Sequence, residues 1–233
     1  MLTSKKLNQI MKKIYSLKFL IVFIMFYSCG NSSEDVKVNS DVKGKSEVKG
    51  EIELKDKSEV KDLLGIKGPL EFNSTTFDLA WSDKPRENYY IQEYLPSGES
   101  PESFNQMMSV HLFLTDLTVD KMVSKKIGEL EDRKKSDPLC NYSSFKSPDG
   151  NEIIVDFVLS EDKEGQIPII EFNAYRYKIS DTGNGSKGII IYAYSKRSYG
   201  DDIDSFLVNL KEDRMKYLDE MSKSSIPAVS ISK

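Results

Sequence analysis

The sequence predicts an α+β fold: an antiparallel sheet of about six to seven strands packed by two amphipathic helices in a sandwich, after a signal peptide and a disordered tether. Three observations predict it. Aromatic and β-branched residues concentrate after residue 65, strand-like runs alternate with turn residues, and two stretches repeat apolar residues at helical spacing. A segment of this size can bury about two-thirds of its unfolded surface. We therefore expect one globular domain over residues 66–224.

The strands are predicted from short runs of aromatic and β-branched residues. They are expected at residues 77–81, 89–95, 107–114, 142–145, 153–159, 169–179 and 188–195. Turn residues separate the first three strands at Pro85 and at 96–101. Two further turns, at 148–150 and 181–186, are typical of hairpins that join the later strands antiparallel.

Two helices are predicted from apolar residues three and four positions apart. The first begins after Thr118, a good N-terminal cap, and ends before Pro138. Its apolar stripe consists of Val119, Met122, Val123, Ile127 and Leu130. The second begins near Asp202 and is expected to bury Ile203, Phe206, Leu207, Leu210, Tyr217, Leu218 and Met221. Residues 225–233 are expected to form a flexible tail.

The first 28 residues resemble a bacterial lipoprotein signal peptide. A basic region directly after Met11, an alternative translation start, precedes the apolar run 19–27, which is far shorter than the roughly 20 residues of a membrane-spanning helix. Cys29 follows between two small residues. The resemblance implies cleavage before Cys29 and attachment of acyl chains such as palmitate to its sulfur. The alternative is an ordinary secretory signal in which the cysteine is incidental.

The residues after Cys29 bear on which membrane would hold the protein. Gly30 differs from the Asp that resembles an inner-membrane retention signal in enteric bacteria. The acidic pair Glu34 and Asp35 is similar to the surface-export signals of Bacteroidota lipoproteins. The expected location is the cell envelope, with the outer membrane favoured. The sequence is compatible with either leaflet of that membrane.

Residues 29–65 contain an internal repeat. An acidic residue, an aliphatic residue and lysine recur five times at a spacing of six, beginning at Asp35, Asp41, Glu47, Glu53 and Glu59. An even period would place the aliphatic residues on one face of a strand, which makes a β-solenoid conceivable. One aliphatic residue in six buries too little apolar surface to offset about 1 to 2 kcal/mol of backbone entropy per residue. We therefore expect a solvated tether; a repeat that binds a partner or peptidoglycan is the alternative.

Two resemblances concern the globular part. The order of three strands, a helix, four strands and a helix resembles the PsbP/Mog1 family over about residues 70–222. The stretch 81–83 followed by 89–96 is similar to lipoproteins of Bacteroidota. The first resemblance implies a binding or assembly module, although this sequence matches none of the binding motifs of that family. The second resemblance implies no activity.

Few residues offer catalytic chemistry. His111 is the only histidine, so a histidine-rich metal site is excluded. We expect it to be a hydrogen-bonded residue on the less buried sheet face; a general base is the alternative. Cys140, the only thiol left after lipidation, is expected to pack in the core, because no basic neighbour in sequence would lower its pKa.

The remaining polar clusters have structural explanations. Asp201, Asp202 and Asp204 fit the first turn of a helix better than a Ca²⁺ site. No glycine-rich phosphate loop, serine nucleophile elbow or paired-cysteine cluster occurs. The net charge of −4, with lysines mixed among carboxylates, argues against nucleic acid as a partner. We therefore expect no cofactor, no metal and no enzymatic activity.

Aromatic residues provide the candidate interaction surface, because exposed Tyr and Trp are common in binding surfaces. They are Trp81, Tyr89, Tyr90, Tyr175, Tyr177, Tyr192 and Tyr194. Ordinary cross-strand packing is the alternative.

These features favour a non-enzymatic lipoprotein, held at a membrane through Cys29, that binds an envelope protein or glycan. One alternative is a surface hydrolase that uses a carboxylate pair such as Asp156 and Glu171. The other is an immunity-type lipoprotein.

Overall fold

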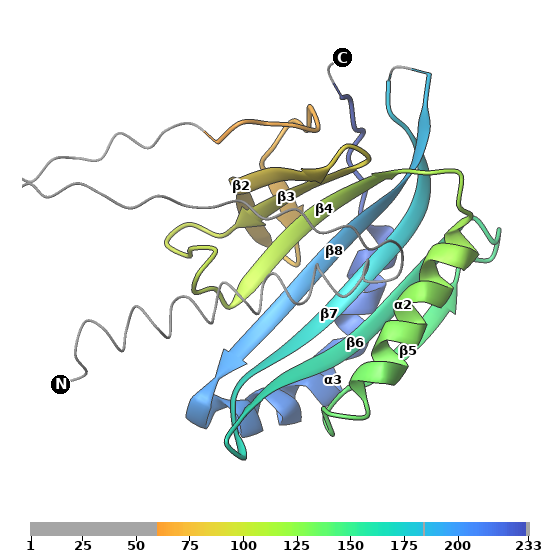
Figure 1. The fold of residues 1–233 in the computed structure, drawn as a ribbon. Coiled ribbons are helices and arrows are strands. Elements are labelled where there is room, and N and C mark those ends of the chain that lie inside the picture. The colour runs from red at the N-terminus through yellow and green to blue at the C-terminus, as the bar shows by residue number, and fades with distance from the viewer. Residues whose placement is uncertain (1–59, 184, 232–233) are drawn as a thin grey trace, which may run out of the picture.

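The computed structural model describes residues 60–231 except residue 184. These residues form an antiparallel sheet in the strand order β1-β2-β3-β4-β8-β7-β6-β5, which curls into a half-barrel (Figure 1). The strands are β1 (Leu70–Phe72), β2 (Thr75–Arg86), β3 (Tyr89–Leu95), β4 (Gln106–Leu114), β5 (Asn141–Lys146), β6 (Glu152–Lys163), β7 (Gln166–Asp181) and β8 (Lys187–Tyr199). The helices are α2 (Val119–Arg133), the short 3₁₀ helix η2 (Gly200–Asp202) and α3 (Ile203–Lys223).

The predicted sheet of six to seven strands packed by two helices in a sandwich is wrong, because the sheet has eight strands and curls into a half-barrel. The three-residue strand β1 is too short to produce an alternating pattern. Several strands also continue through charged residues where apolar alternation ends, as β2 does to Arg86 and β6 does to Lys163. Strands have a right-handed twist that accumulates along their length. Because β7 is 16 residues long, the accumulated twist curls the sheet strongly.

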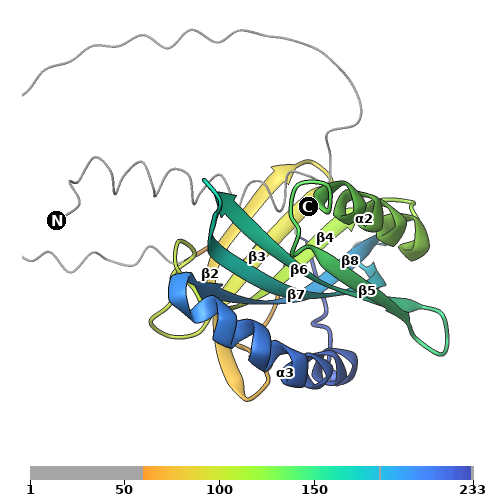
Figure 2. The same cartoon turned by 90° about the horizontal axis from the view of Figure 1, so that it is seen from below.

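The two helices lie on opposite faces of the sheet (Figure 2). Helix α2 packs mainly on β6 and β7, while α3 packs on β6, β7 and β8. We call these surfaces the α2 face and the α3 face. The core of the α2 face includes Val119, Met122, Leu130, Val155, Phe157, Tyr177 and Ile191. The core of the α3 face includes Val110, Phe172, Tyr192, Phe206, Leu210 and Met221. Side chains of β7 and β8 are therefore buried on both sides.

The start of α2 confirms the predicted cap. The Thr118 hydroxyl accepts a hydrogen bond from the Lys121 amide at 3.3 Å. The apolar stripe then places Met122 and Leu130 against the sheet, as predicted. The second predicted helix is also present and buries six of the seven expected residues, Leu207 being partly buried.

The described chain packs beyond both expected ends of the domain. Leu64 is fully buried, and its amide donates to the Gln92 side chain at 2.7 Å. The Ser230 amide donates to the Leu64 carbonyl at 2.7 Å, and Val229 and Ile231 are buried beside it. Val229 and Ile231, expected in a flexible tail, thus belong to the packed core.

The predicted signal peptide, the lipid-attachment residue Cys29 and most of the tether lie outside the described residues. Within residues 60–231, apart from 184, no helix is both long enough and apolar enough to cross a membrane.

The central contact of the sheet is the pairing of β4 with β8. Nine residue pairs join them, from Gln106 with Lys196 to Leu114 with Gly188. At the last pair the backbones approach closely. A Cβ atom on Gly188 would lie 2.5 Å from the Phe113 carbonyl oxygen and 3.1 Å from Leu112 Cδ1. Position 188 therefore requires glycine for space.

We expect Gly188→Ala to lower the free energy of unfolding by about 1 to 3 kcal/mol. The added methyl group would collide with the Phe113 carbonyl oxygen, so the backbones of β4 and β8 would have to move apart. Thermal or urea unfolding of the full chain in detergent measures this change. Gly128→Ala is the matched control: this exposed glycine in α2 has open space around its Cβ position, and the change should stabilise the helix by about 1 kcal/mol. Equal stability of Gly188→Ala and the unchanged protein would contradict this account.

Candidate functional site

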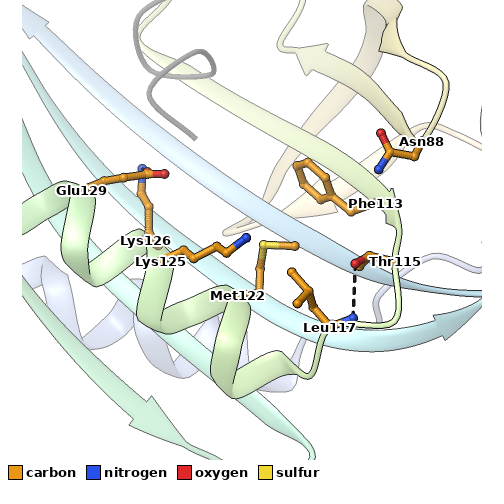
Figure 3. Close-up of a pocket in the computed structure, with 8 residues that line it drawn as sticks. All are labelled: Asn88, Phe113, Thr115, Leu117, Met122, Lys125, Lys126 and Glu129. Carbon is orange, nitrogen blue, oxygen red and sulfur yellow. Dashed lines mark hydrogen bonds and ion pairs between the residues drawn. The ribbon is translucent and has the colours of Figure 1, made fainter. Parts of the chain in front are cut away.

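A cleft of about 220 Å³ lies between α2 and the end of β4 (Figure 3). Helix α2 contributes Met122, Lys125, Lys126 and Glu129. Phe113 at the end of β4, the following connection and the turn between β2 and β3 complete the lining. Because the wall combines apolar and charged groups, it suits a ligand with both apolar and polar parts.

The spacing of residues on α2 explains which of them reach the cleft floor. Positions three and four apart share a helix face, so Met122, Lys126 and Glu129 lie together. Lys125 is one residue, or about 100°, around the helix and is exposed at the rim. The helix thus places one lysine inside and its sequence neighbour outside.

Lys126 is a buried amine, only 4% exposed. Its Nζ lies 3.7 Å from Glu129 Oε2, and it faces the rings of Phe157 and Tyr175 at 4.6 and 5.6 Å from their centroids. Burial lowers the pKa of Lys126, and the carboxylate of Glu129 partly opposes this. Burial likewise raises the pKa of Glu129. Desolvation therefore brings the acidities of the two groups closer together.

Three buried side-chain atoms in the described part of the chain lack a hydrogen bond: Glu129 Oε2, Asn173 Nδ2 and the Tyr177 hydroxyl. All three residues belong to the α2 side of the sheet. Ser195 donates to Asn173 Oδ1 at 2.7 Å, which leaves the Asn173 amide nitrogen unpaired. Burial first, then Tyr175 and Glu129, raise the pKa of Tyr177, so its hydroxyl keeps its proton. Each unpaired buried group costs about 1 to 3 kcal/mol.

His111 belongs to the same face and is 4% exposed. The Tyr89 hydroxyl lies 2.9 Å from its Nδ1, and the Ser109 hydroxyl lies 3.0 Å from its Nε2. Burial, with a smaller contribution from the charge of Lys126, lowers the pKa of His111 to about 3. The predicted hydrogen bonding is confirmed, and the ring is neutral at neutral pH. Its burial is deeper than the sequence suggests, because the α2 face carries a core of its own.

A second polar cluster surrounds Arg197 next to His111. Arg197 Nε donates to Glu171 Oε2 at 2.8 Å, and the guanidinium carbon lies 4.0 Å from the centroid of the Phe104 ring. A small cavity of about 40 Å³ separates this pair from His111 and Ser195. Glu171 is thus neutralised by a buried arginine.

The candidate carboxylate pair Asp156 and Glu171 is not formed. Asp156 accepts two hydrogen bonds from Arg214 of α3, at 2.6 and 2.8 Å, on the α3 face. Glu171 pairs across the sheet with Leu159, three residues after Asp156. An odd offset puts the two side chains on opposite faces, because successive residues of a strand alternate.

The predicted aromatic interaction surface is also wrong as a single exposed face. Five of its residues are buried and divided between the faces: Tyr89, Tyr175 and Tyr177 on the α2 face, Tyr192 and Tyr194 on the α3 face. The reason is register, since Tyr175 lies opposite Ala193 and not opposite a tyrosine. Tyr90 is half-buried and Trp81 is 38% exposed.

The other candidate residues of the sequence have structural roles. Cys140 is buried, with its Sγ 3.6 Å from the Leu130 carbonyl oxygen, as predicted for a packing residue. Burial raises the pKa of its thiol. Asp201 and Asp202 lie in η2, and Asp204 lies in the first turn of α3. In the described residues, no group of three or more His, Cys, Asp or Glu side chains could hold a metal ion.

Lys126 and Glu129 are not among the site residues predicted from the sequence. The signal was present, because the apolar stripe of α2 contains a lysine at the position where another apolar residue would fit. A charged residue on the buried stripe of a helix costs stability, so it indicates a specific environment.

We expect the free energy of unfolding to fall by about 1.4 kcal/mol per pH unit as the pH drops from about 6.5 toward 5. The unfolded chain binds a proton on His111 in this range, whereas the folded chain, with a pKa of about 3, does not. Urea unfolding at pH 7, 6 and 5 measures the slope. Because His111 is the only histidine, His111→Gln should remove this contribution while groups such as Glu129 stay in place. The same slope in both proteins would contradict the assignment.

Comparison with known proteins gives one result. No curated protein and no solved structure matches the chain, and the resemblance to the PsbP/Mog1 family stays a prediction. A protein-family model matches residues 64–226, which contain the whole cleft and both helices. Because this match spans well over half of the chain, the protein belongs to the family that the model describes.

Proposed function

We propose that the protein is a lipid-anchored, non-enzymatic binding module of the cell envelope, and that the cleft on the α2 face is its ligand site. The observation that carries this proposal is the buried Glu129 Oε2 atom, which lacks a hydrogen bond beside the Lys126 amine. A native fold keeps such a pair at a cost of a few kcal/mol, and a ligand that satisfies both groups would recover it.

The contents of the cleft indicate which groups it would accept. Glu129 Oε2 needs a donor, while Lys126 and Lys125 offer donors, so a fitting ligand presents an acceptor beside a donor. Peptide groups and sugar hydroxyls both meet this condition. The volume of about 220 Å³ is below the roughly 300–1,000 Å³ of sites for drug-sized molecules. The cleft therefore fits one residue or one ring, either free or as part of a larger envelope protein or glycan.

The anchoring part of the proposal rests on the sequence. Acyl chains on Cys29 would hold the mature N-terminus in a membrane, with the outer membrane favoured, and two or more chains make such anchoring stable. The tether over residues 29–65 would set the distance between membrane and cleft.

The non-enzymatic part is supported by the state of the titratable groups. Asp156 and Glu171 are each held by an arginine, on opposite faces. His111 is enclosed between two hydroxyl groups. None of these three is available as a base for the hydrolase that the sequence allows as an alternative.

If Cys29 carries the lipid, Cys29→Ser should move the protein from the membrane fraction to the soluble fraction, because serine lacks the sulfur to which the acyl chains would be attached. Incorporation of labelled palmitate, followed by fractionation, measures this. Cys140→Ser is the matched control, since it removes the other thiol but should stay membrane-bound and labelled. A Cys29→Ser protein that still incorporates palmitate would contradict the anchor.

A photo-crosslinking amino acid at position 125, on the rim of the cleft, should capture the envelope ligand in intact cells. The control position is Lys211, which is equally exposed but lies on α3. Leu117→Trp should abolish the product from position 125, because the larger side chain fills the cleft. Val208→Trp on the exposed side of α3 should leave it unchanged. Products from position 125 that match those from position 211, or that persist with Leu117→Trp, would contradict the ligand site.

A further inference from the structure

The Lys126 amine has the surroundings of a reactive lysine. Its Nζ contacts two aromatic rings and one carboxylate. The residue is part of the cleft lining, with its amine beside Glu129 (Figure 3). An amine attacks an electrophile only through its unprotonated form, and a desolvated pocket is one of the ways in which proteins provide that form at neutral pH.

Two opposing effects set the pKa of the Lys126 amine. Burial is the largest cause and lowers its pKa. The contacts with the rings of Phe157 and Tyr175 favour the ammonium form and partly oppose this lowering.

The charged groups around Lys126 oppose the effect of burial on its pKa. Glu129 on α2, Glu171 on β7 and Cys140 before β5 favour the charged form. Tyr175 on β7 offers its ring, and His111 on β4 is neutral at neutral pH. Glu171 is already neutralised by Arg197, so Glu129 is the principal opposing group.

Glu129 supplies the second requirement, a proton donor and acceptor beside the amine. Its Oε2 atom lies 3.7 Å from Nζ and has no hydrogen bond that would hold it elsewhere. Burial raises the pKa of this carboxyl, so it releases a proton less readily than an exposed glutamate. General acid–base assistance of this kind speeds proton transfers by about 10²- to 10⁴-fold.

We propose that Lys126 captures a small aldehyde or ketone in the cleft as a reversible imine. This inference rests on the cleft being the ligand site of the proposed function. The lone pair of Nζ forms a bond to the carbonyl carbon, and the π electrons move to the oxygen, which takes up one of the two protons of this nitrogen. Glu129 in its protonated form then gives its proton to the new hydroxyl group, and the C–O bond breaks as water leaves. The Glu129 carboxylate takes the last proton from the nitrogen, which leaves the C=N bond and restores Glu129. Hydrolysis by the same steps in reverse releases the ligand, so no oxidant or reductant is consumed.

The cleft sets the size of this carbonyl ligand. A volume of about 220 Å³ accommodates a single ring or a short chain. Phe113 and Met122 provide apolar walls, and Lys125 at the rim offers a donor to a polar substituent. The binding module would thus hold its ligand covalently without converting it.

Benzaldehyde with sodium cyanoborohydride tests the proposal, because the reductant converts an imine into a stable secondary amine. The full chain in detergent is treated at pH 7.5, and peptide mass spectrometry measures the labelling rate at each lysine. We expect Lys126 to react at least about tenfold faster than Lys125, since one unit of pKa difference changes the unprotonated fraction tenfold. A labelling rate at Lys126 that does not exceed the rate at Lys125 would overturn the proposal.

Two variants separate chemistry from packing. Lys126→Met keeps a long side chain and should abolish the fast label, while Lys211→Met, at an exposed position of α3 away from the cleft, should leave the rate at Lys126 unchanged. Glu129→Gln keeps the shape of the carboxyl group and should slow labelling at Lys126 by at least about tenfold. Thermal unfolding of each variant shows whether the fold is retained. An unchanged rate in Glu129→Gln would overturn the role of that carboxyl.

The outcome distinguishes this inference from the proposed function. If position 125 crosslinks a ligand in cells but benzaldehyde does not label Lys126 selectively, the cleft binds without an imine and this inference fails alone. If position 125 gives no specific crosslink, the proposed ligand site fails. Fast selective labelling of Lys126 would then show a reactive amine that serves no envelope ligand, which also overturns the inference as stated.

Discussion

The pairing of β4 with β8 is the contact on which the rest of the structure depends. It joins a first group of strands, β1 to β4, to a second group, β5 to β8, and no other strand pair does so. Helix α2 follows β4 and α3 follows β8, so this pairing also determines which face each helix covers. Because α2 packs mainly on β6 and β7 while its preceding strand is β4, the short connection between them passes the intervening strand β8 and borders the cleft.

The two faces of this sheet differ in what they bury. The α3 face buries the carboxylate of Asp156 against Arg214, whereas the α2 face encloses more polar groups: the ion pair of Arg197 and Glu171, the neutral His111 and the Lys126–Glu129 pair. A buried ion pair is often no more stable than apolar residues of the same volume. The three buried atoms without a hydrogen bond cost about 1 to 3 kcal/mol each, a cost that the ion pair with Lys126 reduces at Glu129. This is a large share of the roughly 5 to 15 kcal/mol by which a domain is usually stable. Such an arrangement is hard to explain by stability alone, which favours a function for the α2 face.

The sequence predicts the helices and the middle of most strands, because periodicity and caps such as Thr118 are local signals. It does not predict how many strands there are or which side chains meet, since both depend on pairing between distant segments. Strand β1 is too short to detect, and the parity of the β6–β7 register separates Asp156 from Glu171. The register of β7 with β8 likewise divides the tyrosines between two faces. The cleft is formed by such long-range contacts and so cannot be predicted from local patterns. The one local indication of it is Lys126, a charged residue on the apolar stripe of α2.

The register of α2 connects the fold to the chemistry of the cleft. Lys125 and Lys126 are the same residue type, and a rotation of about 100° along the helix makes one exposed and the other buried. That rotation is fixed by the Thr118 cap and by Val119 and Met122, which are buried against the sheet. A helix turned by one residue would place Lys125 inside and leave Glu129 without a buried partner. The state of the amine is therefore determined by the packing of the whole helix, which depends in turn on where the β4–β8 pairing ends.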